Sequence, residues 1–243
     1  MLRSLSIVIP AYNEEQRLPQ TLERVVGYLA GRNLEFVEVL VVNDGSRDGT
    51  ARVAREAAAR WPMVKLLENP GNRGKGYSVR HGMLKAEGDW VLFSDADLSA
   101  PIEELAELER AVEQQGAAVA IGSRALDRSL IGVHQSVFRE SAGKLFNLLM
   151  RVLVGLTFWD TQCGFKLYRR DASRDVFSRV TTDRFGFDVE ALFIAKLKGH
   201  KTVEVPVRWN HADGTKVSMF GDSLDMFLDL VRVRIKQARG MYN

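Results

Sequence analysis

Two aspartates separated by one residue are the clearest chemical signal in this sequence. Asp95 and Asp97 follow the apolar run 90–94, which predicts a buried strand. Side chains two positions apart on a strand point to the same side, so both carboxylates can meet one hard cation. Mg²⁺ or Mn²⁺ held there can bridge two phosphates and neutralise the charge that develops as a diphosphate leaves. The alternative is a solvated turn in which an aspartate caps the helix predicted after Pro101.

A third acidic residue, Asp44, follows the second predicted strand. With Gly45 beside it, the Asp44 carboxylate can accept a hydrogen bond from the imide of uracil or the equivalent edge of guanine. The same residues also suit a β-turn before a capped helix, and both roles can hold together. Pro10, Ala11 and Tyr12 can wall a base pocket, in which Tyr12 either stacks on the base or simply packs.

Two basic residues are candidates for phosphate contacts. Lys75 lies in the glycine-bearing stretch 72–76, which resembles a phosphate-cradling loop but lacks the spacing of a P-loop or a dinucleotide fingerprint. A loop that simply leads into a helix is the alternative. Arg124 follows the fifth predicted strand, and its planar guanidinium suits a diphosphate, although it can also be a surface arginine.

The elements that position these residues alternate along the first half of the chain. Continuous apolar runs predict strands that are covered on both faces, as a parallel sheet requires. The alternation predicts an α/β, doubly wound, mostly parallel sheet with helices on both faces, which binds ligands beyond the carboxyl ends of its strands. The predicted strands are 6–10, 37–43, 64–67, 90–94 and 118–122, and the predicted helices are 19–30, 50–60, 75–86 and 102–115.

The second half of the chain is predicted to contain two amphipathic helices, at 138–158 and 221–239. Their apolar faces either cover the sheet or lie in a membrane interface, and 138–158 is the better membrane candidate. We therefore expect one domain over 1–243.

Composition narrows the class of protein. The 243 residues suit a single domain, and a formal net charge of +3 with interspersed acids and bases argues against a nucleic-acid binder. The single cysteine, Cys163, indicates a reducing compartment. No apolar run approaches the ~20 residues of a membrane-spanning helix. We expect a cytoplasmic protein that is peripheral on the cytoplasmic face of a membrane.

Several ordered motifs together resemble a known family. They are residues 6–14, 42–46, 72–76, 95–99, 122–124, 160–166, 187–190 and 214–216. The chain resembles the family 2 inverting glycosyltransferases of GT-A fold over nearly its whole length. Within them it is most similar to the polyprenyl-phosphate sugar synthases, above all the dolichyl-phosphate β-glucosyltransferases.

The resemblance implies UDP-glucose as donor and a dolichyl or other polyprenyl phosphate as acceptor, with inversion to a β-linked product. It also implies that residues 1–125 form the nucleotide-sugar-binding half of the domain, and residues 126–243 its acceptor- and membrane-facing half. GDP-mannose as donor, or a soluble glycan hydroxyl as acceptor, remains open.

The chain departs from the family pattern at two points. Eukaryotic glucosyl members carry an N-terminal membrane anchor, which we expect to be absent here. Ser99 stands where some mannosyl relatives have a glutamine.

The resemblance also implies roles for individual residues. The nucleoside would be contacted by Pro10, Tyr12, Glu14 and Asp44. The metal and the donor would be bound by Asp95 and Asp97, and the phosphates by Arg124, Arg139 and Lys216.

This acceptor simplifies the chemistry. A phosphomonoester is largely dianionic at neutral pH and can attack the anomeric carbon without a general base. Catalysis then consists of holding two anionic groups together, which requires a metal and basic side chains. Asp188 could be a base for a hydroxyl acceptor, or it could cap the helix predicted at 189–198.

Two other classes of protein remain as alternatives. A nucleotidyltransferase would be expected to carry a glycine-rich basic loop where this chain has residues 10–14. A non-catalytic binding module would need neither both aspartates nor the basic residues.

Overall fold

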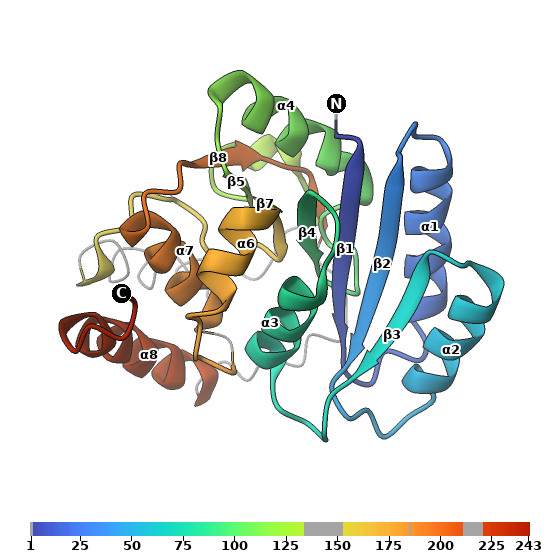
Figure 1. Ribbon diagram of the computed structural model, residues 1–243, viewed down its shortest axis with the longest axis horizontal. Helices are drawn as coiled ribbons and strands as arrows, with labels where there is room; N and C mark the ends of the chain where they lie inside the picture. The colour runs from blue at the N-terminus through green and yellow to red at the C-terminus, as the bar shows by residue number, and fades with distance from the viewer. Residues whose placement is uncertain (1, 134–152, 185, 211–220) are drawn as a thin grey trace.

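The computed structural model describes residues 2–133, 153–184, 186–210 and 221–243. Seven strands form one sheet in the order β3-β2-β1-β4-β7-β5-β8 (Figure 1). β7 runs antiparallel to both its neighbours, β4 and β5, while the remaining pairs are parallel. The strands are β1 (Ser4–Ala11), β2 (Phe36–Asn43), β3 (Val64–Glu68), β4 (Trp90–Ser94), β5 (Val119–Ser123), β7 (Phe165–Arg169) and β8 (Thr202–Pro206). The predicted α/β, mostly parallel sheet is confirmed.

Helices cover both faces of this sheet, as the continuous apolar strands require. Alternate residues of β1 enter different cores: Ile7 and Ile9 pack into one apolar cluster, and Val8 into the other. The first cluster contains residues of α1 (Leu18–Ala30), α2 (Thr50–Arg60) and α4 (Leu105–Gln115). The second contains residues of α3 (Lys75–Lys85), α6 (Arg170–Phe177) and α7 (Phe187–Leu197).

All predicted elements of the first half are present, with ends that differ from the prediction by at most two residues. The exception is the helix predicted at 102–115, which begins as the 3₁₀ turn η1 (Ile102–Glu104) after Pro101. In the second half, β7 and β8 were not predicted, and they join the same sheet as the strands of the first half. A short 3₁₀ turn, η2 (Arg128–Leu130), precedes β6 (Ile131–Val133), which pairs with β9 (Trp209–Asn210).

The two predicted amphipathic helices have different outcomes. Most of 138–158 lies outside the described residues, but residues 155–158 are not helical, so its predicted end is wrong. Gly155 has φ +71°, the left-handed conformation that commonly ends a helix. The second helix is confirmed as α8 (Gly221–Ala238). Across the described ranges, no helix combines the length and the apolar character needed to cross a bilayer.

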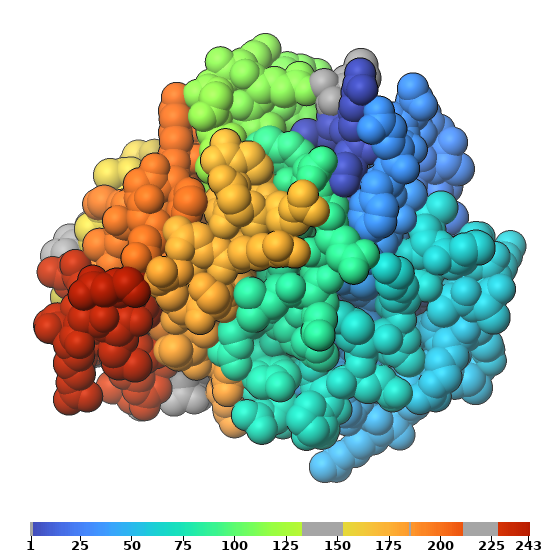
Figure 2. Space-filling model, viewed as in Figure 1, coloured from blue at the N-terminus to red at the C-terminus, as the bar shows by residue number. Residues whose placement is uncertain are grey.

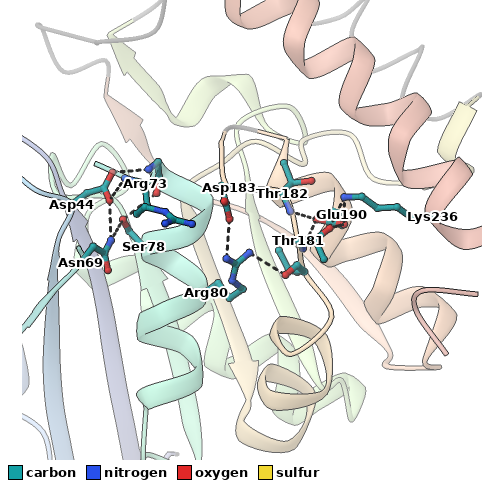
Figure 3. A network of polar contacts seen from close by, with 12 residues as sticks. Asp44, Asn69, Arg73, Ser78, Arg80, Thr181, Thr182, Asp183, Glu190 and Lys236 are labelled. Carbon is teal, nitrogen blue, oxygen red and sulfur yellow. Dashed lines mark hydrogen bonds and ion pairs between the residues drawn. The ribbon is translucent and has the colours of Figure 1, made fainter. Parts of the chain in front are cut away.

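α8 and the C-terminus are fixed to the domain by one buried carboxylate. Glu190 of α7 is fully buried, and its oxygens accept hydrogen bonds from Lys236 Nζ at 3.0 Å and Tyr242 Oη at 2.7 Å. The backbone N–H groups of Thr181 and Thr182 donate to the same carboxylate at 2.9 and 2.7 Å. These contacts hold the pKa of Glu190 below its usual value even though burial acts to raise it. Glu190 therefore ties α8 to α7 and to the 181–184 loop (Figure 3).

We predict that Tyr242→Phe, which removes only the buried hydroxyl, lowers the free energy of unfolding by about 1–2 kcal/mol because Glu190 loses one donor. Urea unfolding measures this. The control is Met241→Ala at the neighbouring residue, which is 51% exposed and should change stability by less than about 0.5 kcal/mol. Equal effects of the two substitutions would show that Glu190 does not anchor the C-terminus.

Candidate functional site

The carboxyl ends of the parallel strands bring the predicted site residues to one edge of the sheet. Asp44 follows β2, Asp95 follows β4 and Arg124 follows β5. Because β1, β2, β4 and β5 point the same way, the loops after them share that edge. Two predicted residues, Arg139 and Lys216, lie outside the described residues and stay predictions.

Asp44 holds the glycine-bearing loop at 71–76 in place. Its carboxylate is buried and accepts hydrogen bonds from Asn69 Nδ2 at 2.8 Å, Arg73 N at 2.9 Å and Gly74 N at 2.8 Å (Figure 3). Asn69 is held in turn by His81 Nδ1 at 2.8 Å. A carboxylate has about four acceptor sites, so Asp44 retains capacity for one more donor, such as a base imide. Asp44 therefore has a structural role in ordering this loop, and its contact with a base stays a prediction. The capped helix of the alternative interpretation is not observed, because the N-cap residue of α2, Gly49, makes no side-chain capping bond.

Gly45 is required by both conformation and space. It has φ +66°, and a Cβ at this position would lie 2.5 Å from the carbonyl carbon of Gly71. The loop after β2 therefore packs directly on the loop after β3, backbone against backbone.

The loop after β1 is joined to the loop after β2. Asn13 N donates to Ser46 Oγ at 3.0 Å, and Asn13 Oδ1 accepts from Arg47 N at 2.8 Å. Asn13 has φ +54°, a conformation that asparagine tolerates better than most residues. The Glu14 carboxylate accepts two hydrogen bonds from the Arg17 guanidinium, at 2.7 and 2.8 Å. The three residues predicted to line a base pocket differ in burial. Pro10 and Ala11 are buried within β1, whereas Tyr12 is half-buried.

Asp95 and Asp97 lie on a turn, which corrects the strand-alternation argument made from sequence. β4 ends at Ser94, and Leu98 N donates to Asp95 O at 3.2 Å, which closes a turn over the two aspartates. Ser99 N donates to Asp97 Oδ1 at 2.9 Å. Leu98 has φ +47°, a strained value for leucine, and such strain is common next to functional residues.

Two lysines lie against the acidic residues of this edge. Lys75 Nζ is 2.6 Å from Asp95 Oδ1, and Lys166 Nζ is 2.5 Å from Asp188 Oδ1. Burial acts to lower the pKa of Lys75, but Asp95 and Asp188 raise it above its usual value, so its ammonium stays charged. Burial raises the pKa of Asp188 although Lys166 and Lys75 act to lower it.

Asp188 does not cap a helix, so that interpretation is wrong. α7 begins at Phe187, which puts Asp188 inside its first turn, and its N-cap residue Gly186 has no side chain to cap with. The Asp188 carboxylate is buried and paired with Lys166, which also donates to Cys163 O at 2.6 Å. A role as general base stays a prediction, for which Asp188 would first have to be released from this pair.

Arg124 is fixed by a two-pronged interaction and is not a free surface arginine. Its Nε and Nη2 donate to the two oxygens of Asp160 at 2.6 and 2.8 Å, and its backbone N donates to the same carboxylate at 3.0 Å. Glu204 holds the segment by accepting from Asp160 N at 2.7 Å. Burial would raise the pKa of Asp160, but the Arg124 guanidinium lowers it to about 2. Burial raises the pKa of the nearby Cys163 thiol to about 12.

The aspartates fit a divalent cation that shares its coordination with a substrate. Within the described part of the chain, no group of three or more His, Cys, Asp or Glu side chains is arranged to hold a metal. Mg²⁺ is commonly held by one or two carboxylates, with phosphate oxygens and water completing its shell. Space for the Asp95 carboxylate depends on Gly164, because a Cβ there would lie 2.0 Å from Asp95 Oδ2. A cation at these two carboxylates would therefore need further ligands from a bound molecule or from water.

Sequence reasoning from residue types missed four members of this edge: Arg17, Asp160, Gly164 and Lys166. Arg17 binds Glu14 and is close enough to Asp97 for that carboxylate to raise its pKa further. The other three lie in the string 160–166, which carried the family resemblance but received no role. Only the unpredicted strand β7 explains their position, since it inserts next to β4.

We predict a specific acid sensitivity from the Arg124–Asp160 pair. Because the folded pKa of Asp160, about 2, lies below its ordinary 3.8, the ionised carboxylate stabilises the fold above pH 3.8. That contribution, on the order of 2 kcal/mol, is lost as pH falls from about 4 to about 2. Asp160→Asn has no titrating group and should lack this part of the pH dependence of unfolding. The free energy of unfolding of both proteins is measured with urea as the pH is lowered. If it fell equally in the wild type and in Asp160→Asn, the Arg124–Asp160 pair would not be the source of the acid sensitivity.

Comparisons with known proteins agree with this architecture. The family described as Glycosyl transferase family 2 matches residues 6–177. The dolichyl-phosphate beta-glucosyltransferase of Drosophila melanogaster is 38% identical over 98% of this chain and 76% of that protein. The enzyme of that name from Homo sapiens is 34% identical over 99% of this chain and 78% of that protein.

A solved structure shares the fold. It is glucosyl-3-phosphoglycerate synthase from Mycobacterium tuberculosis, in complex with Mn²⁺, UDP-glucose and phosphoglyceric acid. It superposes with a TM-score of 0.69 at 17% identity, over 95% of this chain and 79% of that chain. The chain described here belongs to glycosyl transferase family 2, as a homologue of the dolichyl-phosphate beta-glucosyltransferases.

Proposed function

We propose that this protein is a metal-dependent, inverting glucosyltransferase that moves glucose from UDP-glucose onto a dolichyl or other polyprenyl phosphate. The observation that carries the proposal is the Asp95–Asp97 turn at the sheet edge, next to Lys75 of the glycine-bearing loop. The names of the relatives, which are 38% and 34% identical, supply the substrate class.

The edge is suited to an anionic donor. Asp44 orders the loop at 71–76, whose glycines allow the backbone to approach a phosphate, and Lys75 begins α3 next to Asp95. Asp95 and Asp97 would hold Mg²⁺ or Mn²⁺, which supplies charge neutralisation for the departing diphosphate. A neighbour of the same fold binds Mn²⁺ and UDP-glucose together with a phosphate-bearing acid.

The acceptor side follows from charge. A dianionic phosphate is already a nucleophile, so the reaction does not require Asp188 to leave its pair with Lys166. The basic residues then counter the repulsion between two anionic substrates. Asp160 holds the Arg124 guanidinium in place before the substrates bind, so this side chain does not need to reorient during the reaction. Arg139 and Lys216 are proposed for the same task.

The direct experiment offers labelled UDP-glucose and GDP-mannose to the protein, with a short polyprenyl phosphate or a soluble glycan as acceptor. Glucose transfer to the polyprenyl phosphate, with a β-linkage, is expected. Transfer from GDP-mannose alone, or only to a soluble hydroxyl, would replace the proposed substrates. A protein that binds UDP but transfers to nothing would be a binding module.

We predict that Asp97→Ala reduces transfer at least about 100-fold, because removing a metal-binding carboxylate costs several kcal/mol of transition-state stabilisation. The melting temperature should stay close to that of the wild type, because Asp97 is only half-buried. Transfer is measured in excess Mn²⁺, with Asp89→Ala at the opposite edge as control. Wild-type rates in Asp97→Ala would remove this residue from the metal site.

A lipid acceptor implies contact with a membrane, and α8 is the described element best suited to it. It carries exposed Leu228, Val231 and Ile235, at 39, 39 and 45% exposure. Arg234 of the same helix and Arg239, which directly follows it, are also exposed. In the space-filling view, the dark red C-terminal segment that contains α8 lies at the lower left of the molecule (Figure 2). An apolar face with arginines beside it fits an anionic bilayer surface. The membrane role of 138–158 and the cytoplasmic face both stay predictions.

We predict that Val231→Asp with Ile235→Asp abolishes co-sedimentation with vesicles of phosphatidylcholine and phosphatidylserine. Each substitution puts a charge where apolar area would be buried. UDP affinity should be unchanged, since the donor edge is formed by other elements. Leu84→Asp on α3, a residue 39% exposed, is the matched control. Unchanged sedimentation of the double variant would rule out α8 as the membrane contact.

A further inference from the structure

The contact between Lys75 and Asp95 poses a problem for the metal site. Lys75 Nζ lies 2.6 Å from Asp95 Oδ1, while Asp95 Oδ2 faces the backbone of Gly164. An ammonium at hydrogen-bond distance occupies a position from which a cation would bind Asp95. A divalent cation on the same carboxylate would be repelled by that ammonium at close range.

The neighbouring pair of Lys166 and Asp188 is more deeply buried than the pair of Lys75 and Asp95. The side chains of Lys166 and Asp188 are 1 and 5% exposed, and Lys166 is also held by Cys163 O. The side chains of Lys75 and Asp95 are 26 and 29% exposed, so solvent and ligands reach them. Lys75 can therefore move, whereas Lys166 is fixed in the core.

A diphosphate bound at the start of α3 would give the Lys75 ammonium a second partner. Lys75 is the first residue of α3, whose N-cap residue Gly74 makes no side-chain capping bond. Asp44 fixes the backbone N–H groups of Arg73 and Gly74, so only the side chain of Lys75 needs to move. A diphosphate at this helix start would attract the ammonium.

We propose that Lys75 is a built-in counter-ion of the metal site, which neutralises Asp95 in the absence of metal and transfers to the donor diphosphate when the cation binds. This inference rests on the proposed function. Because metal alone must displace the ammonium, metal alone binds weakly. Because the diphosphate accepts the displaced ammonium, metal and donor bind cooperatively.

The test is Mn²⁺ binding to the whole protein, followed by electron paramagnetic resonance, with and without UDP. Without UDP, Lys75→Met should bind Mn²⁺ at least about 5-fold more tightly than the wild type, because no ammonium competes for Asp95. Adding Asp95→Asn to Lys75→Met should abolish the gain. The enhancement of Mn²⁺ affinity by UDP, expected to be at least about 5-fold in the wild type, should shrink in Lys75→Met.

The matched control is Lys65→Met. It removes another lysine–carboxylate pair, with Glu38 at 2.8 Å, and should leave Mn²⁺ binding unchanged. Lys75→Gln, which retains a donor without the charge, is the second variant, and thermal melting reports on folding of each. Unchanged or weaker Mn²⁺ binding in the folded Lys75 variants would overturn the proposal, as would wild-type Mn²⁺ binding that UDP does not enhance. A wild type that binds no Mn²⁺ even with UDP would instead defeat the proposed function.

Discussion

Charge neutralisation at the carboxyl edge of the sheet is the constraint on which the remaining structure depends. β4 delivers Asp95 to this edge with its side chain 29% exposed, and a carboxylate that is partly withdrawn from water is costly to leave unpaired. Lys75 offsets that cost from α3, and Arg124 and Asp160 balance one another a short distance along the edge. The described part of the edge is thus arranged in ion pairs. Under the proposed function, a metal with a diphosphate would replace the Lys75–Asp95 pair without leaving either side chain unpaired.

Two groups of polar contacts, joined through helix α3, connect this edge to the C-terminal helix. The first contains Asp44, which orders the loop before α3, and the second begins with Arg80, whose Nη2 lies 2.8 Å from Asp183 Oδ1. The loop containing Asp183 packs against the first turn of α3, since Tyr77 N donates to Asp183 O at 3.1 Å. It also packs against the glycine-bearing loop, because a Cβ at Gly74 would lie 2.4 Å from Asp183 O. Glu190 then joins this loop to α8 through Lys236 (Figure 3). If α8 meets the membrane, the donor loop and the lipid surface are fixed relative to one another by these contacts.

Much of this arrangement was predictable from sequence, because apolar runs and polar strand ends identify a parallel sheet and its binding edge. Local pattern could not reveal β7, since a strand that returns from the second half to pair between β4 and β5 is defined by long-range pairing. The residues near it, including Lys166, therefore received no role. The strand end itself was predicted correctly, at residue 94. The strand-alternation argument for Asp95 and Asp97 failed because alternation holds only within a strand, and both aspartates lie on the turn that follows it. Nor could sequence show that Lys75 faces Asp95, because that contact joins α3 to the end of β4.

The most direct test is a crystal structure of the protein with Mn²⁺ and UDP. We expect Mn²⁺ at Asp95 or Asp97, and Lys75 Nζ, now 2.6 Å from Asp95 Oδ1, at a diphosphate oxygen. A bound UDP with Lys75 still on Asp95, and with no metal at either aspartate, would contradict both the metal site and the role of Lys75.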